Sequence, residues 1–426
     1  MSWYLLIPFV ILILAFLIRM PIGWGMLLGC IVYFVVQDID LKVVMNTAGY
    51  SMYSSYILIA IPLFIFMANI MNTSEVSDKM FGFANSLVGR FHGGMGYVNI
   101  ICSLIFAGMT GSALADASGV GKLEIQHMKK EGYDAPFAAA LTATTSVIGP
   151  TFPPSIPMVV FAMISGASVG KLFLGGVIPA LIQCIVLAIY VYLVSKKRNY
   201  PRGEKISFKN FLHNTLVALP ALLTPVLLLV GIYTGVMTPT EAGAVAAAYT
   251  LLISIFVYRT LTWKGFKKVL LDTLKTTGSI FVIVAAAYSF SYIINLEQVA
   301  PWLSALISSF NGSKTLFLLM INIIFLILGC FVDVNVTQLV FVPIFIPLAK
   351  ALGIDMVHLG VVLCLNMMIG LCTPPFGMLL FISANGGECA LKDVIREALP
   401  MVGFMLVGLI LITFIPDLVM WLPNMM

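Results

Sequence analysis

Two apolar segments of this chain are interrupted by glycine and proline at the same internal position. The first reads IGPTFPPSIP at 148–157 and the second reads IGLCTPPFGM at 369–378, an ungapped offset of 221 residues. Proline removes a backbone donor and clashes with the carbonyl four residues before it, so the middle prolines release the carbonyls of Gly149 and Gly370 from helical bonding. In an apolar environment a released carbonyl needs another partner. The paired breaks therefore predict two interrupted helices that present oxygen ligands.

The same offset relates a longer stretch of sequence around each break. At least eleven identities fall within 72 positions, and glycines and prolines coincide at the points of interruption. The identical pairs include Gly108/Gly329, Lys129/Lys350, Gly132/Gly353, Asp134/Asp355, Ile148/Ile369, Gly149/Gly370, Pro153/Pro374, Pro154/Pro375, Gly166/Gly387, Lys171/Lys392 and Pro179/Pro400. Matched breaks in two repeats are typical of secondary transporters, whose sites lie near the bilayer midplane. An alternative remains, in which the prolines only kink two ordinary helices.

The composition places this repeat in a membrane. Of the 426 residues, 61% are hydrophobic and 10% are charged, and the mean hydropathy is +1.06. These values exclude a soluble domain. Ten apolar runs are long enough to cross a bilayer, the first two being short: 3–18, 21–36, 47–71, 135–168, 171–195, 211–233, 236–259, 276–294, 357–386 and 397–421.

Two further apolar stretches, 95–128 and 315–350, carry small or polar residues at their centres and are interpreted as re-entrant hairpins. With the N-terminus outside and both hairpins not crossing, 19 of the 23 Lys and Arg fall on the cytoplasmic side, including the clusters at 196–205 and 259–268. The two repeats are then inverted, and both termini are predicted to be periplasmic. The polar segment 72–94 is expected to form an interfacial helix.

The hairpin tips supply polar groups that could face the breaks. The first tip carries Thr110, Ser112 and Asp116, and the second carries Asp333, Asn335 and Thr337, with Thr373 inside the second break. Hydroxyls, short amides and released carbonyls can replace the hydration shell of Na⁺. For Asp116 a cap within the hairpin and a functional role are equally open, whereas Glu241 is expected to cap a helix. Dispersed cysteines and histidines and the lack of catalytic motifs predict no transition metal, no organic cofactor and no enzyme activity.

Three motifs resemble the large membrane subunit of tripartite ATP-independent periplasmic (TRAP) transporters: GMTGSALADASGVG at 108–121, GPTFPPS at 149–155 and GLCTPPFG at 370–377. The resemblance implies an all-α polytopic membrane protein of the ion transporter superfamily, with inverted repeats, two re-entrant helical hairpins and two broken helices. It also implies an elevator-type mechanism for Na⁺-coupled import of an organic acid anion across the bacterial inner membrane. Sialic acid (N-acetylneuraminate) is the first expectation and a C4-dicarboxylate the next.

The resemblance also implies partners and a complete set of sites. The partners are a soluble periplasmic substrate-binding protein and a small four-helix membrane subunit, expected as a separate polypeptide because the sequence begins at the first helix of the large subunit; no nucleic acid is involved. The first Na⁺ site is expected at Thr110, Ser112, Gly149, Phe152 and Pro154, and the second at Asp333, Asn335, Thr337, Gly370, Thr373 and Pro375. Substrate contacts are expected at Ser112, Thr145 and Asn366.

The expected domain division alternates scaffold and transport segments. Scaffold helices with the interfacial arm occupy 1–94, the first transport repeat 95–170, further scaffold helices 171–294, the second transport repeat 295–390 and a terminal scaffold helix 391–426. Two alternatives to the tripartite transporter remain. One is a single-component Na⁺-coupled anion transporter without a binding protein, and the other is a structural subunit that conducts nothing.

Overall fold

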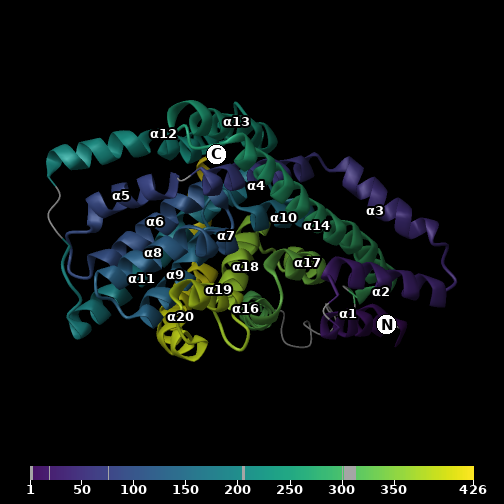
Figure 1. The fold of residues 1–426 in the computed structure, drawn as a ribbon. Coiled ribbons are helices and arrows are strands. Elements are labelled where there is room, and N and C mark those ends of the chain that lie inside the picture. Colours follow the sequence, from purple (N-terminus) through teal and green to yellow (C-terminus); the bar gives the residue numbers. More distant parts are fainter. Residues whose placement is uncertain (1–2, 19, 75, 204–206, 300, 302–312) are drawn as a thin grey trace.

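The computed structural model describes residues 3–18, 20–74, 76–203, 207–299, 301 and 313–426, and this part of the chain is helical without any β-strand (Figure 1). Parts of the expected cluster at 196–205 and of the expected repeat at 295–390 lie outside these residues. Eight helices within the described part are long and apolar enough to cross a membrane. The chain is therefore an all-α, multi-pass membrane protein.

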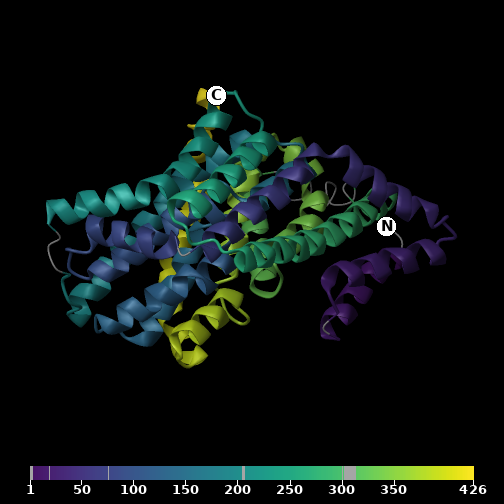
Figure 2. The same ribbon diagram turned by 45° about the horizontal axis from the view of Figure 1, so that its top comes forward.

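One group of helices is connected to the long helix α14, either directly or through neighbouring helices. Its members are α1 (Leu6–Leu17), α2 (Ile22–Val36), α3 (Lys42–Ser54), α4 (Ala60–Thr73), α5 (Val76–Val88), α12 (Phe208–Tyr233), α13 (Pro239–Leu252) and α14 (Trp263–Leu296). Helix α14 packs against α2, α3 and α4, and α12 packs against α13 and α5. In both views α1 and α2 lie at one end of the elongated molecule (Figure 2).

Two of these helices differ from the crossings expected from hydropathy. The expected run 47–71 is divided between α3 and α4, because Ser55 has an extended backbone, with φ −102° and ψ 95°. The expected run 276–294 is only the second part of α14, which starts at Trp263 after Thr262 caps it by accepting a bond from the Gly265 N–H. Charged residues in the first turns of α14 lower its hydropathy without preventing the helix.

The repeat found in the sequence is also a structural repeat. Its first copy consists of α6 (Gly94–Thr110), α7 (Ala113–Ser118), α8 (Val120–Lys130), α9 (Ala135–Thr145) and α10 (Ile156–Ser165), and its second of α16 (Lys314–Phe331), α17 (Val334–Ala351), α18 (Met356–Gly370) and α19 (Met378–Gly387). The ends of α6 and α16, the ends of α8 and α17, and the starts of α9 and α18 are each separated by 221 residues. Both interrupted helices stop and restart, so they are broken rather than kinked.

A long helix follows each repeat: α11 (Val169–Arg198) and α20 (Leu391–Phe414), the latter continued by the short α21 (Asp417–Met420). The two helices pack against each other, α11 also against α18 and α6, and α20 also against α9 and α18. The Gln183 side chain donates to the Met405 carbonyl at 3.3 Å. Both helices therefore contact the repeats. The expected division, which places 171–294 and 391–426 with the scaffold, stays a prediction.

Candidate functional site

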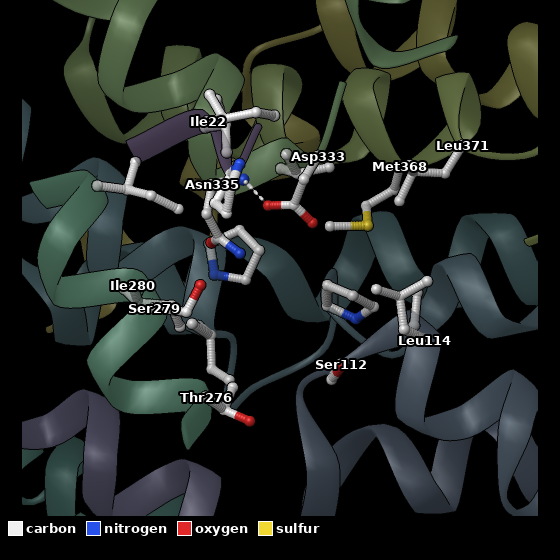
Figure 3. A pocket seen from close by; sticks show the side chains of 18 of the residues that line it. Ile22, Ser112, Leu114, Thr276, Ser279, Ile280, Asp333, Asn335, Met368 and Leu371 are labelled. Carbon is white, nitrogen blue, oxygen red and sulfur yellow. Dashed lines mark hydrogen bonds between the residues drawn. The ribbon is translucent and has the colours of Figure 1, made fainter. Parts of the chain in front are cut away.

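A cavity of about 820 Å³ lies where the two hairpin tips meet the two breaks (Figure 3). The first tip contributes 111–114 and the second contributes 333–336. The breaks add Pro150, Ile156, Pro157, Leu371 and Phe376, and the remaining walls are Leu17, Met20, Pro21, Ile22, Thr276, Ser279, Ile280, Ile283 and Met368. The structure thus joins four segments that are far apart in the sequence around one cavity.

The tip of the first hairpin touches the first break directly. Gly111 has a left-handed φ of 57°, and a Cβ added there would lie 2.3 Å from the Pro154 carbonyl oxygen, so only glycine fits. Next to it, Ser112 caps α7 by accepting a bond from the Ala115 N–H at 3.4 Å. A Cβ added to Gly149 would lie 3.8 Å from the Ser112 carbonyl carbon. Three residues of the expected first Na⁺ site, Ser112, Gly149 and Pro154, are therefore neighbours.

The other two residues of that expected site line the same junction less directly. Thr110 is buried, and its hydroxyl donates to the Phe106 carbonyl at 3.2 Å, which leaves the oxygen lone pairs as acceptors. The Phe152 ring lies beside the position a Cβ on Gly108 would take, at 3.6 Å. Among the described residues, no backbone N–H bonds to the Gly149 carbonyl: Pro153 lacks the α-helical donor, and the Phe152 N–H bonds to the Ile148 carbonyl instead.

The second tip is built around Asp333, which caps α17. Its Oδ1 accepts a bond from the Asn335 N–H at 2.9 Å (Figure 3), and its carbonyl accepts a bond from the Thr337 hydroxyl at 3.0 Å. The Asn335 Oδ1 atom is buried and has no hydrogen-bond partner within the described part. A carboxylate and an unused amide oxygen therefore stand together at the cavity wall.

The second break differs from its expected form in one respect. The Gly370 carbonyl is not released, because it accepts a bond from the Thr373 N–H at 2.8 Å. Thr373 precedes the proline and so keeps a donor that can close a short turn. The Thr373 hydroxyl in turn donates to the Ile369 carbonyl at 2.8 Å. Pro375 follows, and both breaks contain a cis peptide bond at the same repeat position, Pro153–Pro154 and Pro374–Pro375.

Two of the three expected substrate contacts do not line the cavity. The Thr145 hydroxyl donates to Asn99 Oδ1 on α6 at 2.6 Å, and Asn366 Nδ2 donates to Asn322 Oδ1 on α16 at 2.6 Å. Thr145 and Asn366 occupy equivalent repeat positions, and each ties a broken helix to the first arm of its own hairpin. They therefore connect helices within each repeat. Of the three expected substrate contacts, only Ser112 lines the cavity.

Sequence reasoning missed the contribution of α14 to the cavity. Thr276 and Ser279 bring hydroxyl groups to a wall that is otherwise formed by the repeats, by apolar residues of α14 and by the α1–α2 region at 17–22 (Figure 3). Thr273, Thr276 and Ser279 follow one another at a spacing of three residues, and hydroxyl groups so placed on a helix share roughly one face. This spacing is the sequence feature from which the contribution of α14 could have been predicted.

The remaining acidic residues singled out from the sequence have clear positions. Glu241 caps α13 as expected: its side chain accepts bonds from the Thr238 N–H at 2.8 Å and completes a capping box. Asp116 lies in the first turn of α7 and is not its cap, because Ser112 has that role. The alternative of a capping role for Asp116 is thus wrong.

The fold and cavity together define a class, the membrane transporters built from interrupted repeats. Residues 9–418 match the family described as "Tripartite ATP-independent periplasmic transporter, DctM component", and the chain belongs to this family. It is therefore a transport protein and not an enzyme.

Similar proteins agree with this family. The chain is 37% identical over 409 residues to the sialic acid TRAP transporter large permease protein SiaM of Vibrio cholerae, covering 95% of each chain. It is 38% identical over 369 residues to the C4-dicarboxylate TRAP transporter large permease protein DctM of Pseudomonas aeruginosa, covering 87% of this chain and 86% of the other. The Alcanivorax borkumensis YdaH transporter matches the fold with a TM-score of 0.65 over 88% of both chains, at 13% identity.

Proposed function

We propose that this chain imports an organic acid anion together with Na⁺, and that sialic acid is its first candidate substrate. The observation that carries the proposal is the cavity between the two hairpin tips and the two breaks. Its volume of about 820 Å³ suits a small organic molecule. Relatives named for sialic acid and for C4-dicarboxylates support an acidic substrate without choosing between them.

Na⁺ is the proposed coupling ion at both tip–break junctions. Each positive charge that enters down a potential of 100 mV contributes about 2.3 kcal/mol, which allows accumulation of an anion. Ser112 with the Gly149 carbonyl would serve the first site. Asp333, Asn335 and Thr373 would serve the second.

We further propose that the repeats, with α11 and α20 attached, move as one unit against α14 and its neighbours. A polar network supports this grouping, because Arg198 at the end of α11 binds Glu397 of α20 at 2.8 Å and Asp134 at the start of α9 at 3.2 Å. Burial raises the pKa of the adjacent Tyr200 phenol to about 12. Its hydroxyl therefore stays protonated and donates a hydrogen bond to Asp134. The proposed setting is the bacterial inner membrane with both termini periplasmic.

The proposed partners are a small four-helix membrane subunit and a periplasmic substrate-binding protein. Reconstitution tests the whole proposal: proteoliposomes with this chain and the small subunit receive labelled N-acetylneuraminate, with and without the binding protein and an inward Na⁺ gradient. Uptake is expected only when both are present. Uptake without the binding protein would establish the single-component alternative, and uptake without a Na⁺ gradient would refute the coupling.

A further inference from the structure

Two acidic side chains are buried inside the first hairpin, away from the cavity. Asp116 on α7 and Glu124 on α8 are each 1% exposed. None of their four carboxylate oxygens has a hydrogen-bond partner within the described part of the chain. Ionised carboxylates in such surroundings are costly, and they persist only when a cation or several donors offset the charge.

The groups around these acids are two hydroxyls, a thiol and each other's carboxylate rather than cations. The hydroxyls of Ser103 and Ser146 face Asp116, and the Cys102 thiol and Asp116 itself face Glu124. No Lys, Arg or His is among the groups that face either acid in the described residues.

The two hydroxyls add oxygen lone pairs to the acidic cluster. Ser146 donates its one hydroxyl hydrogen to the Thr142 carbonyl at 2.8 Å, so only its oxygen lone pairs can be directed at Asp116. Ser103 is fully buried, and its hydroxyl has no hydrogen-bond partner among the described residues. The single hydrogens of the Ser103 hydroxyl and the Cys102 thiol can pair with at most two of the four carboxylate oxygens. The remaining carboxylate oxygens and the hydroxyl lone pairs are the kind of ligands that a hard cation takes.

The second repeat shows that the fold does not require this cluster. At the offset of 221 residues, Ser103, Asp116, Glu124 and Ser146 correspond to Ile324, Thr337, Phe345 and Met367. The same backbone thus accommodates an almost wholly apolar set in the second hairpin. The acids are a feature of the first hairpin alone and are not explained by the two matched tip–break junctions.

We propose that Asp116 and Glu124, with the Ser103 and Ser146 hydroxyls, bind one Na⁺ ion within the first hairpin. This ion is additional to those at the tips and has no counterpart in the second repeat. It would join α6, α7, α8 and the start of the first break, which are the segments that carry these four residues. Its role in transport rests on the proposed function, but its binding does not.

Equilibrium binding of ²²Na⁺ to the purified complex of this chain with its small subunit, without substrate, tests the site. Glu124→Gln removes the charge with little change of shape and is expected to bind one Na⁺ per chain fewer than wild type. Asp116→Asn and the double variant are also expected to lose one ion, because the two acids share it. Glu131→Gln is the matched control, since Glu131 is exposed at the end of the same arm, and it is expected to bind the wild-type number.

Two results would overturn the proposal. One is an unchanged Na⁺ count in Glu124→Gln, whether or not one proton fewer is bound. The other is a loss of two ions in the double variant. Should Glu124→Gln not fold, Glu124→Asp is expected to keep the ion with affinity at least about tenfold weaker, and unchanged affinity would count against the site. Failure of the proposed function is distinguishable, because Na⁺-independent uptake would leave these binding counts unaffected.

Discussion

Asp333 combines two roles that one substitution can separate. Its side chain caps α17 and also brings a negative charge to the cavity wall. Asparagine caps helices about as well as aspartate but carries no charge.

Asp333→Asn is therefore expected to fold normally and to raise the Na⁺ concentration for half-maximal uptake at least about tenfold, a loss of about 1.4 kcal/mol. Na⁺ titration of uptake in proteoliposomes measures this. The matched control is Asp355→Asn, because Asp355 caps α18 in the same way at an exposed position away from the cavity. Equal Na⁺ dependence in both variants would remove Asp333 from the ion site.

Thr145 gives a prediction about stability rather than about binding, because its hydroxyl is hydrogen-bonded to Asn99 and does not line the cavity. Thr145→Val leaves the Asn99 Oδ1 without its donor and is expected to cost about 1–3 kcal/mol of stability. The apparent Tm in detergent should fall, while the KM of the folded protein for substrate should change less than about twofold. A large rise in KM at unchanged Tm would instead support the substrate-binding role expected from the sequence.

The sequence identifies polar residues at membrane depth more reliably than it identifies what they bind. Ser112 and Asp333 could be located at the hairpin tips from the sequence, and both line the cavity. Their role as ion ligands stays a prediction. Thr145 and Asn366 carry the same kind of signal, but their partners Asn99 and Asn322 lie on other helices. Only the three-dimensional structure shows that these side chains are hydrogen-bonded to a neighbouring helix.

Helices α16 and α18 meet through two glycines, one from each helix. A Cβ added to Gly370 would lie 2.8 Å from the Gly329 Cα, and one added to Gly329 would lie 2.8 Å from the Met367 carbonyl oxygen. Small residues permit this close approach of two backbones, as they commonly do in membrane proteins.

Gly370→Ala is expected to separate the two helices and to destabilise the protein by about 1–3 kcal/mol through overpacking. Thermal unfolding of the purified protein measures the change. Gly403→Ala on α20 provides the control, because no atom lies within 4 Å of a Cβ built there, and helix propensity favours alanine by up to about 1 kcal/mol. Similar Tm values for the two variants would show that α16 and α18 tolerate separation.

At the level of helices, the repeat could be predicted nearly residue by residue, because glycine and proline fix where helices stop. The N-terminal turns of α14 could not, since the basic residues that suggest a loop instead extend from the surface of a helix. The proposed grouping of α11 and α20 with the repeats also rests on packing that the sequence does not show. Hydropathy shows that a helix crosses the membrane, but it does not show which neighbours the helix packs against.

A large side chain placed in the cavity is expected to block uptake. Ser279→Trp on α14 would place a large side chain in the space between the tips and is expected to lower uptake at least about tenfold without changing the Tm. Leu274→Trp lies on the same helix at a position that is 68% exposed, outside the cavity lining. That control should retain uptake. Full activity of Ser279→Trp would mean that substrate passes elsewhere.

The wall contributed by α14 has an evolutionary consequence. The proposed ion ligands all belong to the repeats, whereas Thr276 and Ser279 belong to a helix outside them. A change in α14 can therefore alter which acid fits while the proposed ion ligands stay intact. We expect that natural selection or laboratory evolution for a new substrate would first succeed through substitutions in α14. The proposed Na⁺ coupling would stay unchanged.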